Sequence, residues 1–331
     1  MPSRAIIAFI VFGFVSVACS HSPAAGHFAI AAQYSAASSF SEGLAAVQIG
    51  NAPGKWGFIN KTGTLVIPAQ YLFTGDFSGG LAPVQVGDTA DAKWGFIDKT
   101  GAVKIAAQFS FADNFSDGLA AVQVLDDPDA KWGFINTTGA LAIQARFDLA
   151  DRFSEGLAPV RIGDAKTGRW GFVNTTGTLV IAPQFVQASS FREGVAAVRT
   201  GDDTNGLWGF IDKTGAMIIA PQYQGASAFS DGLAAVHVGD EKTGTSGYID
   251  KSGRMAIAAT FNFADPFMDG LAAVRVGDAK TGKWGFIDKT GRMAIAPQFD
   301  ARDIISKGFR DGLALVRVGD YKTGTWGYIA K

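Results

Sequence analysis

The stretch Lys283-Trp-Gly-Phe-Ile-Asp-Lys-Thr-Gly291 decides the fold, because the chain repeats it with small changes along its whole length. Six further copies occupy 55–63, 93–101, 131–139, 169–177, 207–215 and 245–253, and a shortened copy ends the chain at 325–331. Trp284, Phe286 and Ile287 favour strands. Asp288 and Gly291 bound a tight hairpin turn, in which Asp bonds a nearby backbone N–H and Gly takes a left-handed conformation. The stretch therefore predicts a strand, a turn and a second strand.

A third strand precedes each copy. In the copy above it is Gly270-Leu-Ala-Ala-Val-Arg-Val276, and the chain returns after the turn as Met293-Ala-Ile-Ala296. Each unit is thus expected to be a three-stranded antiparallel meander. The first two recurring aromatic residues are 37 residues apart and the remaining steps are 38: Tyr34, Tyr71, Phe109, Phe147, Phe185, Tyr223, Phe261 and Phe299. Such a period indicates an array in which each unit buries its faces against its neighbours.

The ends of the array favour a closed ring. The last copy ends at Lys331 without its final strand, and Phe28-Ala-Ile-Ala-Ala-Gln-Tyr34 matches the missing strand. We therefore predict an all-β fold of eight three-stranded antiparallel units of about 38 residues in one domain, 28–331, with residues 28–34 completing the last unit of a propeller-like ring. An open β-superhelix is the alternative.

The chain resembles the WG-repeat family of bacterial proteins, which is named for the Trp-Gly pair. The resemblance covers essentially all of 28–331. It rests on Lys-Trp-Gly-Phe-Ile-Asp-Lys-Thr-Gly, preceded in nearly every copy by Phe-Ser-Asp/Glu-Gly-Leu-Ala-Ala-Val. The resemblance implies a repeat scaffold, often exported, without a common catalytic activity.

The N-terminus has the pattern of an export signal. Arg4 precedes an apolar run over 5–15, and small residues follow, so we expect residues 1–18 to be a signal peptide. Val17-Ala18-Cys19 resembles the lipobox of bacterial lipoproteins, which implies that Cys19 is acylated, although Ser16 stands where the family usually has leucine.

This N-terminus also predicts where the protein resides. Ser20 resembles the sorting position of outer-membrane lipoproteins, and residues 19–27 would be a flexible tether. We expect an exported protein of the bacterial cell envelope that touches the membrane only through its N-terminal lipid. Cleavage near Ala18 or Ala24 would instead give a periplasmic or secreted protein.

Composition narrows the classes of molecule that the protein could bind. A formal net charge of −1 lacks the basic footprint of nucleic-acid binding. One cysteine rules out a disulfide framework or a cysteine metal site within the chain. Loops of the form Gly-Asp-x-x-Thr-Gly, such as 277–282, carry one Asp each, too few for the six to eight oxygens of calcium. We expect no cofactor and no metal, and a monomer.

The tryptophans are the first candidate binding residues. They recur at Trp56, Trp94, Trp132, Trp170, Trp208, Trp284 and Trp326. A symmetric loop 277–282 would place Arg275 opposite Trp284, where a guanidinium plane can stack on the indole. The rows could be aromatic platforms for sugars or peptides, or a structural ladder that seals one unit on the next. We favour the ladder, because identical use in every unit is what packing requires.

Two irregular places are further candidates. In the sixth unit Ser246 replaces the tryptophan and His237 stands opposite, which would form either a small polar pocket or a neutral variation. Before the last unit, 302–308 carries four extra residues, and we predict that Ile304 and Ile305 contact a partner.

We find no sequence signature of catalysis. The acidic residues mostly obey the repeat and share one position before a glycine, as a turn requires: Glu42, Asp117, Glu155, Glu193, Asp231, Asp269 and Asp311. We therefore expect a non-catalytic, exported, lipid-anchored scaffold that binds a protein or an envelope polysaccharide. The alternative is a lectin-like carbohydrate-binding module, or a carbohydrate-active enzyme with a carboxylate pair.

Overall fold

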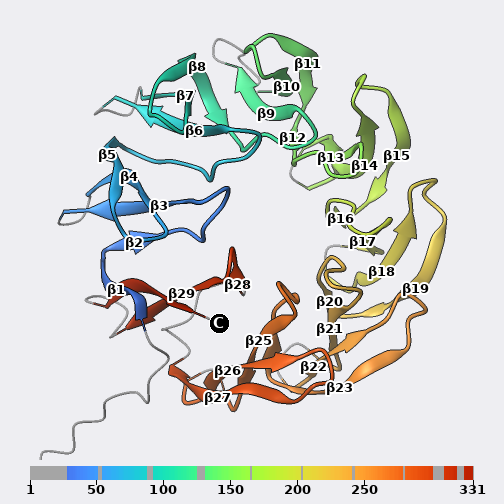
Figure 1. Ribbon diagram of the computed structural model, residues 1–331. Coiled ribbons are helices and arrows are strands. Elements are labelled where there is room, and N and C mark those ends of the chain that lie inside the picture. Colours follow the sequence, from blue (N-terminus) through green and yellow to red (C-terminus); the bar gives the residue numbers. More distant parts are fainter. Residues whose placement is uncertain are drawn as a thin grey trace, which may run out of the picture.

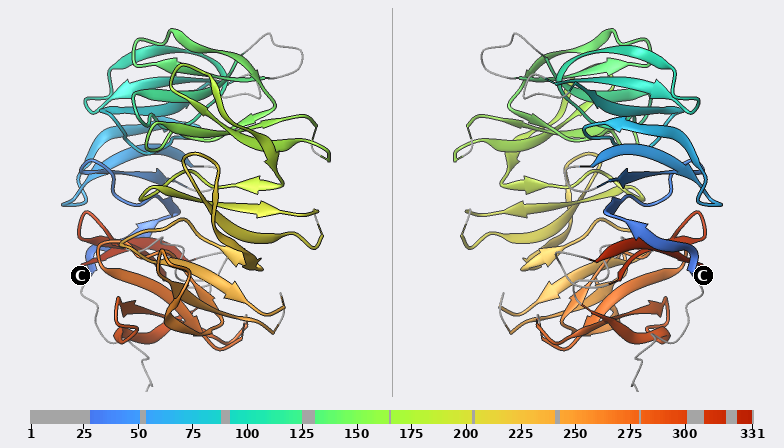
Figure 2. Two further views of the ribbon diagram at one scale, coloured as in Figure 1. Left: turned by 90° about the vertical axis from the view of Figure 1, so that its right-hand side faces the viewer. Right: turned by 90° about the vertical axis from the view of Figure 1, so that its left-hand side faces the viewer.

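The protein is an all-β ring. The computed structural model describes residues 28–50, 54–87, 92–124, 131–164, 166–202, 204–240, 243–278, 280–300, 309–318 and 324–330. Eight repeat units, numbered here 1 to 8 in chain order, stand around a central axis (Figure 1). Views from the side show that the ring is thinner along its axis than across it (Figure 2).

The strands of each unit pair in antiparallel fashion and are ordered from the axis outward (Figure 1). Six units begin with a two-residue inner strand: β2 (Ala36–Ala37), β12 (Leu149–Ala150), β16 (Gln187–Ala188), β20 (Gly225–Ala226), β24 (Phe263–Ala264) and β28 (Phe309–Arg310). The second strands are β3 (Leu44–Ile49), β6 (Leu81–Val86), β9 (Leu119–Val124), β13 (Leu157–Ile162), β17 (Val195–Thr200), β21 (Ala234–Val238), β25 (Leu271–Val276) and β29 (Leu313–Val318). The inner strand is an addition to the three strands expected from the sequence.

The remaining strands form the outer half of each sheet. The Trp-Gly strands, in which unit 6 has Ser-Gly, are β4 (Lys55–Asn60), β7 (Lys93–Asp98), β10 (Trp132–Asn136), β14 (Arg169–Asn174), β18 (Leu207–Asp212), β22 (Thr245–Ile249), β26 (Lys283–Asp288) and β30 (Thr325–Ala330). The outermost are β1 (Phe28–Tyr34), β5 (Leu65–Tyr71), β8 (Val103–Ala112), β11 (Leu141–Phe147), β15 (Leu179–Phe185), β19 (Met217–Tyr223), β23 (Met255–Phe261) and β27 (Met293–Asp300).

Two connections shape the ring. β8 pairs with β7 in unit 2 and with β9 in unit 3, so these units share one six-stranded sheet and the eight units form seven hydrogen-bonded sheets. At the other end, β1 pairs with β30, with Ile30 opposite Tyr328 and Tyr34 opposite Trp326. The first strand therefore lies in the last sheet (Figure 1), and the predicted closed ring is confirmed.

The core lies between the units rather than within them. Successive side chains of a strand point to opposite faces, so Phe58 packs against unit 2 while Ile59 packs against unit 8. Edge-to-face or tilted aromatic pairs cross every junction, with ring centroids 4.7 to 5.3 Å apart: Phe58–Phe77, Phe96–Phe115, Phe134–Phe153, Phe172–Phe191, Phe210–Phe229, Tyr248–Phe267, Phe286–Phe309 and Tyr328–Phe40. The pair of units 8 and 1 thus closes the ring with the contact used elsewhere.

The glycine of the Trp-Gly pair is required because a larger residue would clash with the neighbouring strand. The outer strand shifts register beside it, as between Trp170 and Phe172 of β14. A Cβ atom on Gly171 would lie 2.5 Å from the carbonyl oxygen of Ile181 and 2.7 Å from the nitrogen of Pro183. No side chain fits so close to another backbone, and this explains why glycine follows the tryptophan position in all eight units.

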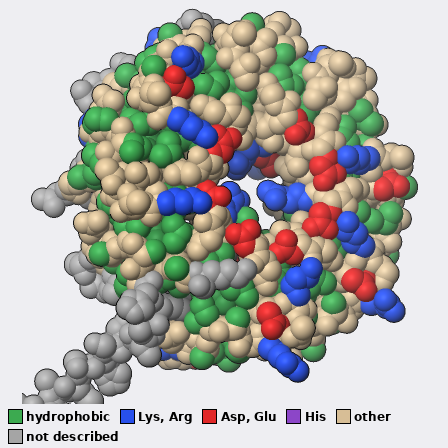
Figure 3. All heavy atoms as spheres, in the orientation of Figure 1, with side chains coloured by type: hydrophobic (Ala, Val, Ile, Leu, Met, Phe, Trp, Pro, Cys, Tyr) green, Lys and Arg blue, Asp and Glu red, His purple; other side chains and the backbone are tan. Residues whose placement is uncertain are grey.

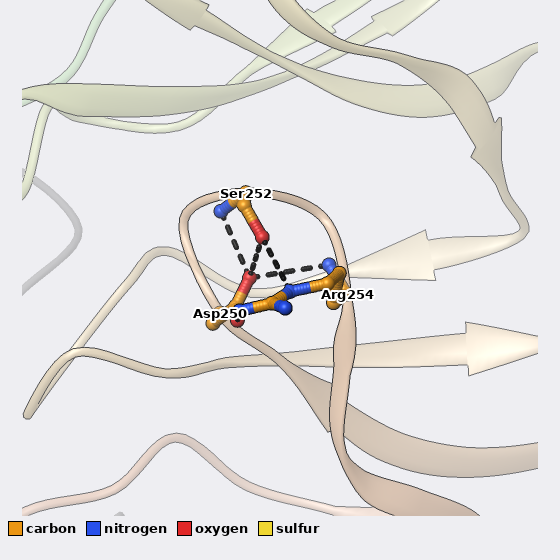
Figure 4. Close-up of polar contacts among 3 residues, drawn as sticks. All are labelled: Asp250, Ser252 and Arg254. Carbon is orange, nitrogen blue, oxygen red and sulfur yellow. Dashed lines mark hydrogen bonds and ion pairs between the residues drawn. The ribbon is translucent and has the colours of Figure 1, made fainter.

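The Asp-Lys-Thr-Gly turn joins the two outer strands in the predicted manner. Figure 4 shows its variant in unit 6, where Asp250 Oδ1 accepts hydrogen bonds from the Ser252 N–H at 2.9 Å, the Ser252 hydroxyl at 2.5 Å and the Arg254 N–H at 3.2 Å. Such bonds to the charged carboxylate hold the pKa of Asp250 below its usual value, with the Ser252 hydroxyl as the largest cause.

Several predictions fall outside the described residues. Residues 1–27, with Cys19, and residues 301–308, with Ile304 and Ile305, are among them. Within the described part of the chain, no helix is long and apolar enough to cross a membrane.

Candidate functional site

The strand register places an Arg or Gln opposite each tryptophan. The expected pair of Arg275 with Trp284 is confirmed, and the other units that have the tryptophan repeat it: Gln48–Trp56, Gln85–Trp94, Gln123–Trp132, Arg161–Trp170, Arg199–Trp208 and Arg317–Trp326.

Four of these partner side chains also donate to a carbonyl of the loop before the Trp strand: Gln48, Gln85, Arg199 and Arg317. Gln48 Nε2 donates to the Gly54 carbonyl at 2.9 Å, and Arg199 Nε donates to the Gly206 carbonyl at 3.0 Å. Stacking is seen where the Arg317 guanidinium lies 5.8 Å from the centre of the Trp326 ring. These side chains therefore fasten the loop to the sheet, and one of them also covers an indole.

The indoles are not open platforms. Trp94 and Trp284 are 8% exposed and Trp326 is 9% exposed, while the other four are partly buried. Indole nitrogens of Trp56 and Trp284 are buried without a hydrogen-bond partner in the described structure. A sugar stacking on these rings would first have to displace protein contacts.

In unit 6 the two replacements meet. His237 lies opposite Ser246, its Nδ1 lies 3.2 Å from the Ser246 hydroxyl, and its Nε2 lies 3.2 Å from the Asp240 carbonyl oxygen. Ser246 is 6% exposed. The histidine thus bonds the loop of unit 6 that corresponds to the loops bonded by Gln48 in unit 1 and Arg199 in unit 5. A binding role for His237 and Ser246 stays a prediction.

The Gly-Asp-x-x-Thr-Gly loops use their carboxylates internally. Asp164 Oδ1 accepts hydrogen bonds from the backbone N–H groups of Lys166 at 2.8 Å and Thr167 at 2.7 Å, and Asp278 has the equivalent bonds. The backbone bonds hold the pKa of Asp164 below its usual value, and the pKa of Asp278 is lowered by the Thr281 hydroxyl first and by the backbone bonds next. Across the described residues, no three His, Cys, Asp or Glu side chains are grouped so as to hold a metal ion.

The acidic residues before the turn glycines link neighbouring units. Glu155 has a φ of 55°, in the left-handed region, as the first central residue of a type I′ turn does. Its Oε2 accepts from the Gly194 N–H at 3.0 Å and pairs with Lys213 Nζ at 3.1 Å, both in unit 5. Equivalent bonds include Glu42 with Gly80 and Lys99, Glu193 with Gly232 and Lys251, and Asp311 with Gly43 and Lys61. We call this carboxylate, its glycine N–H and its lysine the latch.

A cavity on the ring axis is the best candidate site. Its volume is about 380 Å³, and its lining comes from units 3 to 8: Ser116, Asp151, Arg152, Phe153, Ser154, Ser190, Arg192, Ala228, Ser230, Asp265, Pro266, Met268 and Arg310. Seen along the axis, Lys, Arg, Asp and Glu side chains gather around the central opening (Figure 3). We call it the axial cavity.

The axial cavity is where the repeat is broken. The residue before each latch position is serine in five units, at Ser41, Ser78, Ser116, Ser154 and Ser230. In units 5, 7 and 8 it is Arg192, Met268 and Arg310, and all three line the cavity. In these three units the flanking residues keep the repeat pattern, with Phe before and an acidic residue and Gly after, so the change is confined to this one position.

The charges in the cavity differ in how far they are paired. Arg152 Nε lies 3.2 Å from Asp113 Oδ2, and burial raises the pKa of Asp113 above its usual value although Arg152 opposes this. Asp151 Oδ1 accepts from the Arg152 N–H at 2.7 Å. Arg192 has no side-chain partner among the described residues, and Arg310 Nε is buried without one.

A second cavity of about 260 Å³ lies between units 2 and 3. It is lined by Thr74, Gly75, Asp76, Pro83, Trp94, Phe111, Ala112, Asp113 and Asn114. Asn114 Oδ1 and Thr74 Oγ1 are buried without a partner in the described structure. Because Asn114 Oδ1 would lie 2.2 Å from a Cβ on Gly75, the asparagine packs into space that the glycine leaves.

The axial cavity was not predicted from the sequence. Its signal was present in the substitutions of one serine position by Arg192, Met268 and Arg310. The sequence predicted a closed ring but not which residues face its axis, where the structure brings residues from six units to one place.

Comparison with known proteins agrees with this architecture. The family model for the WG-containing repeat matches residues 24–51, 56–89, 94–126, 132–164, 170–202, 208–241, 247–278 and 284–321. The chain therefore belongs to the WG-repeat family. No curated protein matches its sequence.

Solved structures share the fold at low sequence identity. A crystal structure of the eukaryotic initiation factor is 13% identical with a TM-score of 0.59, covering 91% of this chain and 86% of that one. Dipeptidyl peptidase 4 of Porphyromonas gingivalis is 10% identical with a TM-score of 0.56, covering 87% and 57%. A prolyl endopeptidase is 10% identical with a TM-score of 0.55, covering 84% and 52%. This chain spans little more than half of each peptidase, and the fold resembles the propellers of peptidases.

Proposed function

We propose that the protein is a non-catalytic binding propeller that holds a segment of a partner protein in the axial cavity. The observation that carries this is the break in the repeat at Arg192, Met268 and Arg310, which all line one cavity. Ligand sites usually occupy concave places with a few convergent polar groups on an apolar lining. Here arginines and serines surround Phe153, Pro266 and Met268.

A protein partner fits the site better than a sugar on the tryptophan rows. Sugar-binding platforms need exposed aromatic faces, whereas these indoles are buried or partly buried in the ladder. The cavity, by contrast, joins apolar surface to charged donors, as an amino-acid side chain with a polar end requires.

The test is affinity capture with a blocked cavity. Residues 20–331 would be immobilised, envelope extract passed over them, and retained proteins and glycans identified. Ser154→Trp with Ser230→Trp fills the cavity from two units, and Val103→Trp is the control, because Val103 is 64% exposed on the outermost strand of unit 2. We expect a saturable protein partner for the wild type and the control, and none for the filled variant. Retained polysaccharide, or a partner indifferent to filling, contradicts the proposal.

We further propose that the propeller works outside the cytoplasm on a lipid anchor at Cys19. The support is the signal-like segment 1–18 and the lipobox resemblance at Val17-Ala18-Cys19. Cys19→Ala should move the protein from the membrane fraction to the soluble one and abolish labelling by a palmitate analogue. Retention of the unlabelled variant in the membrane fraction would contradict the proposed anchor. It would not bear on the proposed binding in the axial cavity.

A further inference from the structure

We propose that the axial cavity recognises side-chain carboxylates of an acidic polypeptide segment through Arg192 and Arg310. This inference rests on the proposed function and adds the chemistry of the partner. The supporting observation is that two arginine side chains of the cavity lack acceptors, whereas its carboxylates already accept hydrogen bonds.

The donors are the two arginines that replace serine. Arg310 Nε is buried and makes no hydrogen bond in the described structure, and Arg192 has no ion-pair partner there. A buried donor without an acceptor costs free energy, which a bound acceptor would recover. Guanidinium groups present parallel N–H donors that match the two oxygens of a carboxylate.

The acceptors of the cavity are occupied. Asp151 receives the Arg152 N–H on Oδ1 and lies 3.4 Å from the Ser190 hydroxyl on Oδ2. Asp265 also has an interaction partner within the protein. The Arg152 guanidinium is held by Asp113, which lines the second cavity. Among the charged side chains that line the cavity, the two without a hydrogen-bond or ion-pair partner in the described structure are therefore Arg192 and Arg310.

The lining favours a polypeptide over an anionic glycan or a phosphate. Phe153, Ala228, Pro266 and Met268 give one cavity an apolar part beside its guanidinium groups. The aliphatic stem of glutamate can cover such surface while its carboxylate reaches an arginine. A hydroxyl-rich sugar would bury polar groups against the apolar part at a cost.

The repeat itself supplies the mildest test variants. Arg192→Ser and Arg310→Ser install the residue that Ser41, Ser78, Ser116, Ser154 and Ser230 show at the equivalent position. The matched control is Arg254→Ser, which removes the same charge from an outer turn where the side chain is 83% exposed (Figure 4).

The probes are oligoglutamate, oligoglutamine, polygalacturonate and inorganic polyphosphate, titrated by calorimetry against the wild type and the three variants. Oligoglutamate should bind the wild type and lose about tenfold or more in affinity with each cavity variant, as a lost charged hydrogen bond implies. Affinity should weaken as salt screens the charges. Arg254→Ser should bind like the wild type, and the charge reversal Arg192→Glu with Arg310→Glu should prefer oligolysine.

Equal binding of oligoglutamate by wild type and cavity variants, absence of such binding, or preference for polygalacturonate or polyphosphate would overturn the inference. Its failure is separable from that of the proposed function. A partner lost on filling the cavity but retained by Arg192→Ser and Arg310→Ser would leave the function standing and remove the acidic segment. A partner retained by the filled cavity would remove both.

Discussion

The junction of units 4 and 5 and the junction of units 2 and 3 are built from the same repeat, yet only the first carries a latch. Glu155 joins the Gly194 N–H and Lys213 across the first junction. At the second, Gly79 stands at the acidic position and Thr137 at the lysine position.

Both junctions nevertheless keep the aromatic pair. Phe172–Phe191 and Phe96–Phe115 both have their ring centroids 4.9 Å apart. Burying a phenyl ring contributes about 1.5–3 kcal/mol, whereas an exposed ion pair contributes about 0–1 kcal/mol. The comparison indicates that apolar packing holds the ring closed and that the latch only adds to it.

The largest effect is expected from the aromatic pair. Phe172→Ala and Phe96→Ala remove fully buried rings from the two junctions and should each lower the free energy of unfolding by about 3–5 kcal/mol. Urea unfolding followed by tryptophan fluorescence measures this. Phe73→Ala, at a ring that is 58% exposed, is the control and should have little effect. A much smaller loss of stability for Phe96→Ala than for Phe172→Ala would contradict the conclusion that apolar packing holds both junctions together.

The next effect concerns the Trp-Gly glycine in unit 4. Gly171→Ala drives a Cβ into the backbone of the outer strand and should cost about 3 kcal/mol, near the upper end for overpacking. Gly156→Ala meets no atom within 4 Å and bears only the strain of a φ of +86°, about 1–2 kcal/mol. Thermal unfolding ranks the two variants. Equal costs would show that backbone conformation, rather than close approach, fixes the glycine.

A smaller effect should appear on breaking the latch. Burial works to raise the pKa of Glu155, but hydrogen bonds from Lys213 and the Gly194 N–H hold it below its usual value. A lowered folded pKa gives stability that is present above the unfolded pKa of about 4.3 and is lost as pH falls through the folded value. Glu155→Gln should therefore cost about 0.5 kcal/mol at pH 7, since both side chains are partly exposed, and less at pH 3. A difference that grows on acidification would contradict this sign.

The smallest effect is a gain from building the missing latch. Gly79→Glu with Thr137→Lys supplies both partners to the junction of units 2 and 3, where Gly79 already has a φ of 61°, close to that of Glu155. A double-mutant cycle should show a favourable coupling of about 0.2–1 kcal/mol that disappears in high salt. Absence of coupling would mean that the lysine cannot reach the carboxylate there.

Because the sequence repeats, much of this structure could be predicted from it. The strand pairs of Arg275 with Trp284 and of His237 with Ser246 follow from loop length and side-chain alternation. The inner strands were missed because two residues such as Ala36 and Ala37 carry no periodic signal. Bonding of Gln48 to a loop carbonyl was likewise missed, since it depends on where that loop lies.

The sequence by itself determined the eight units, three strands and the turns of each, and the match between residues 28–34 and the final strand of unit 8, because these depend on local chemistry and period. Only the tertiary structure decided where the units face one another. Ring closure sets Tyr328 against Phe40 and gathers Arg192, Met268 and Arg310 around one axis, although these residues lie far apart in the chain. Local rules cannot specify such convergence, since it depends on the summed rotation of all eight units.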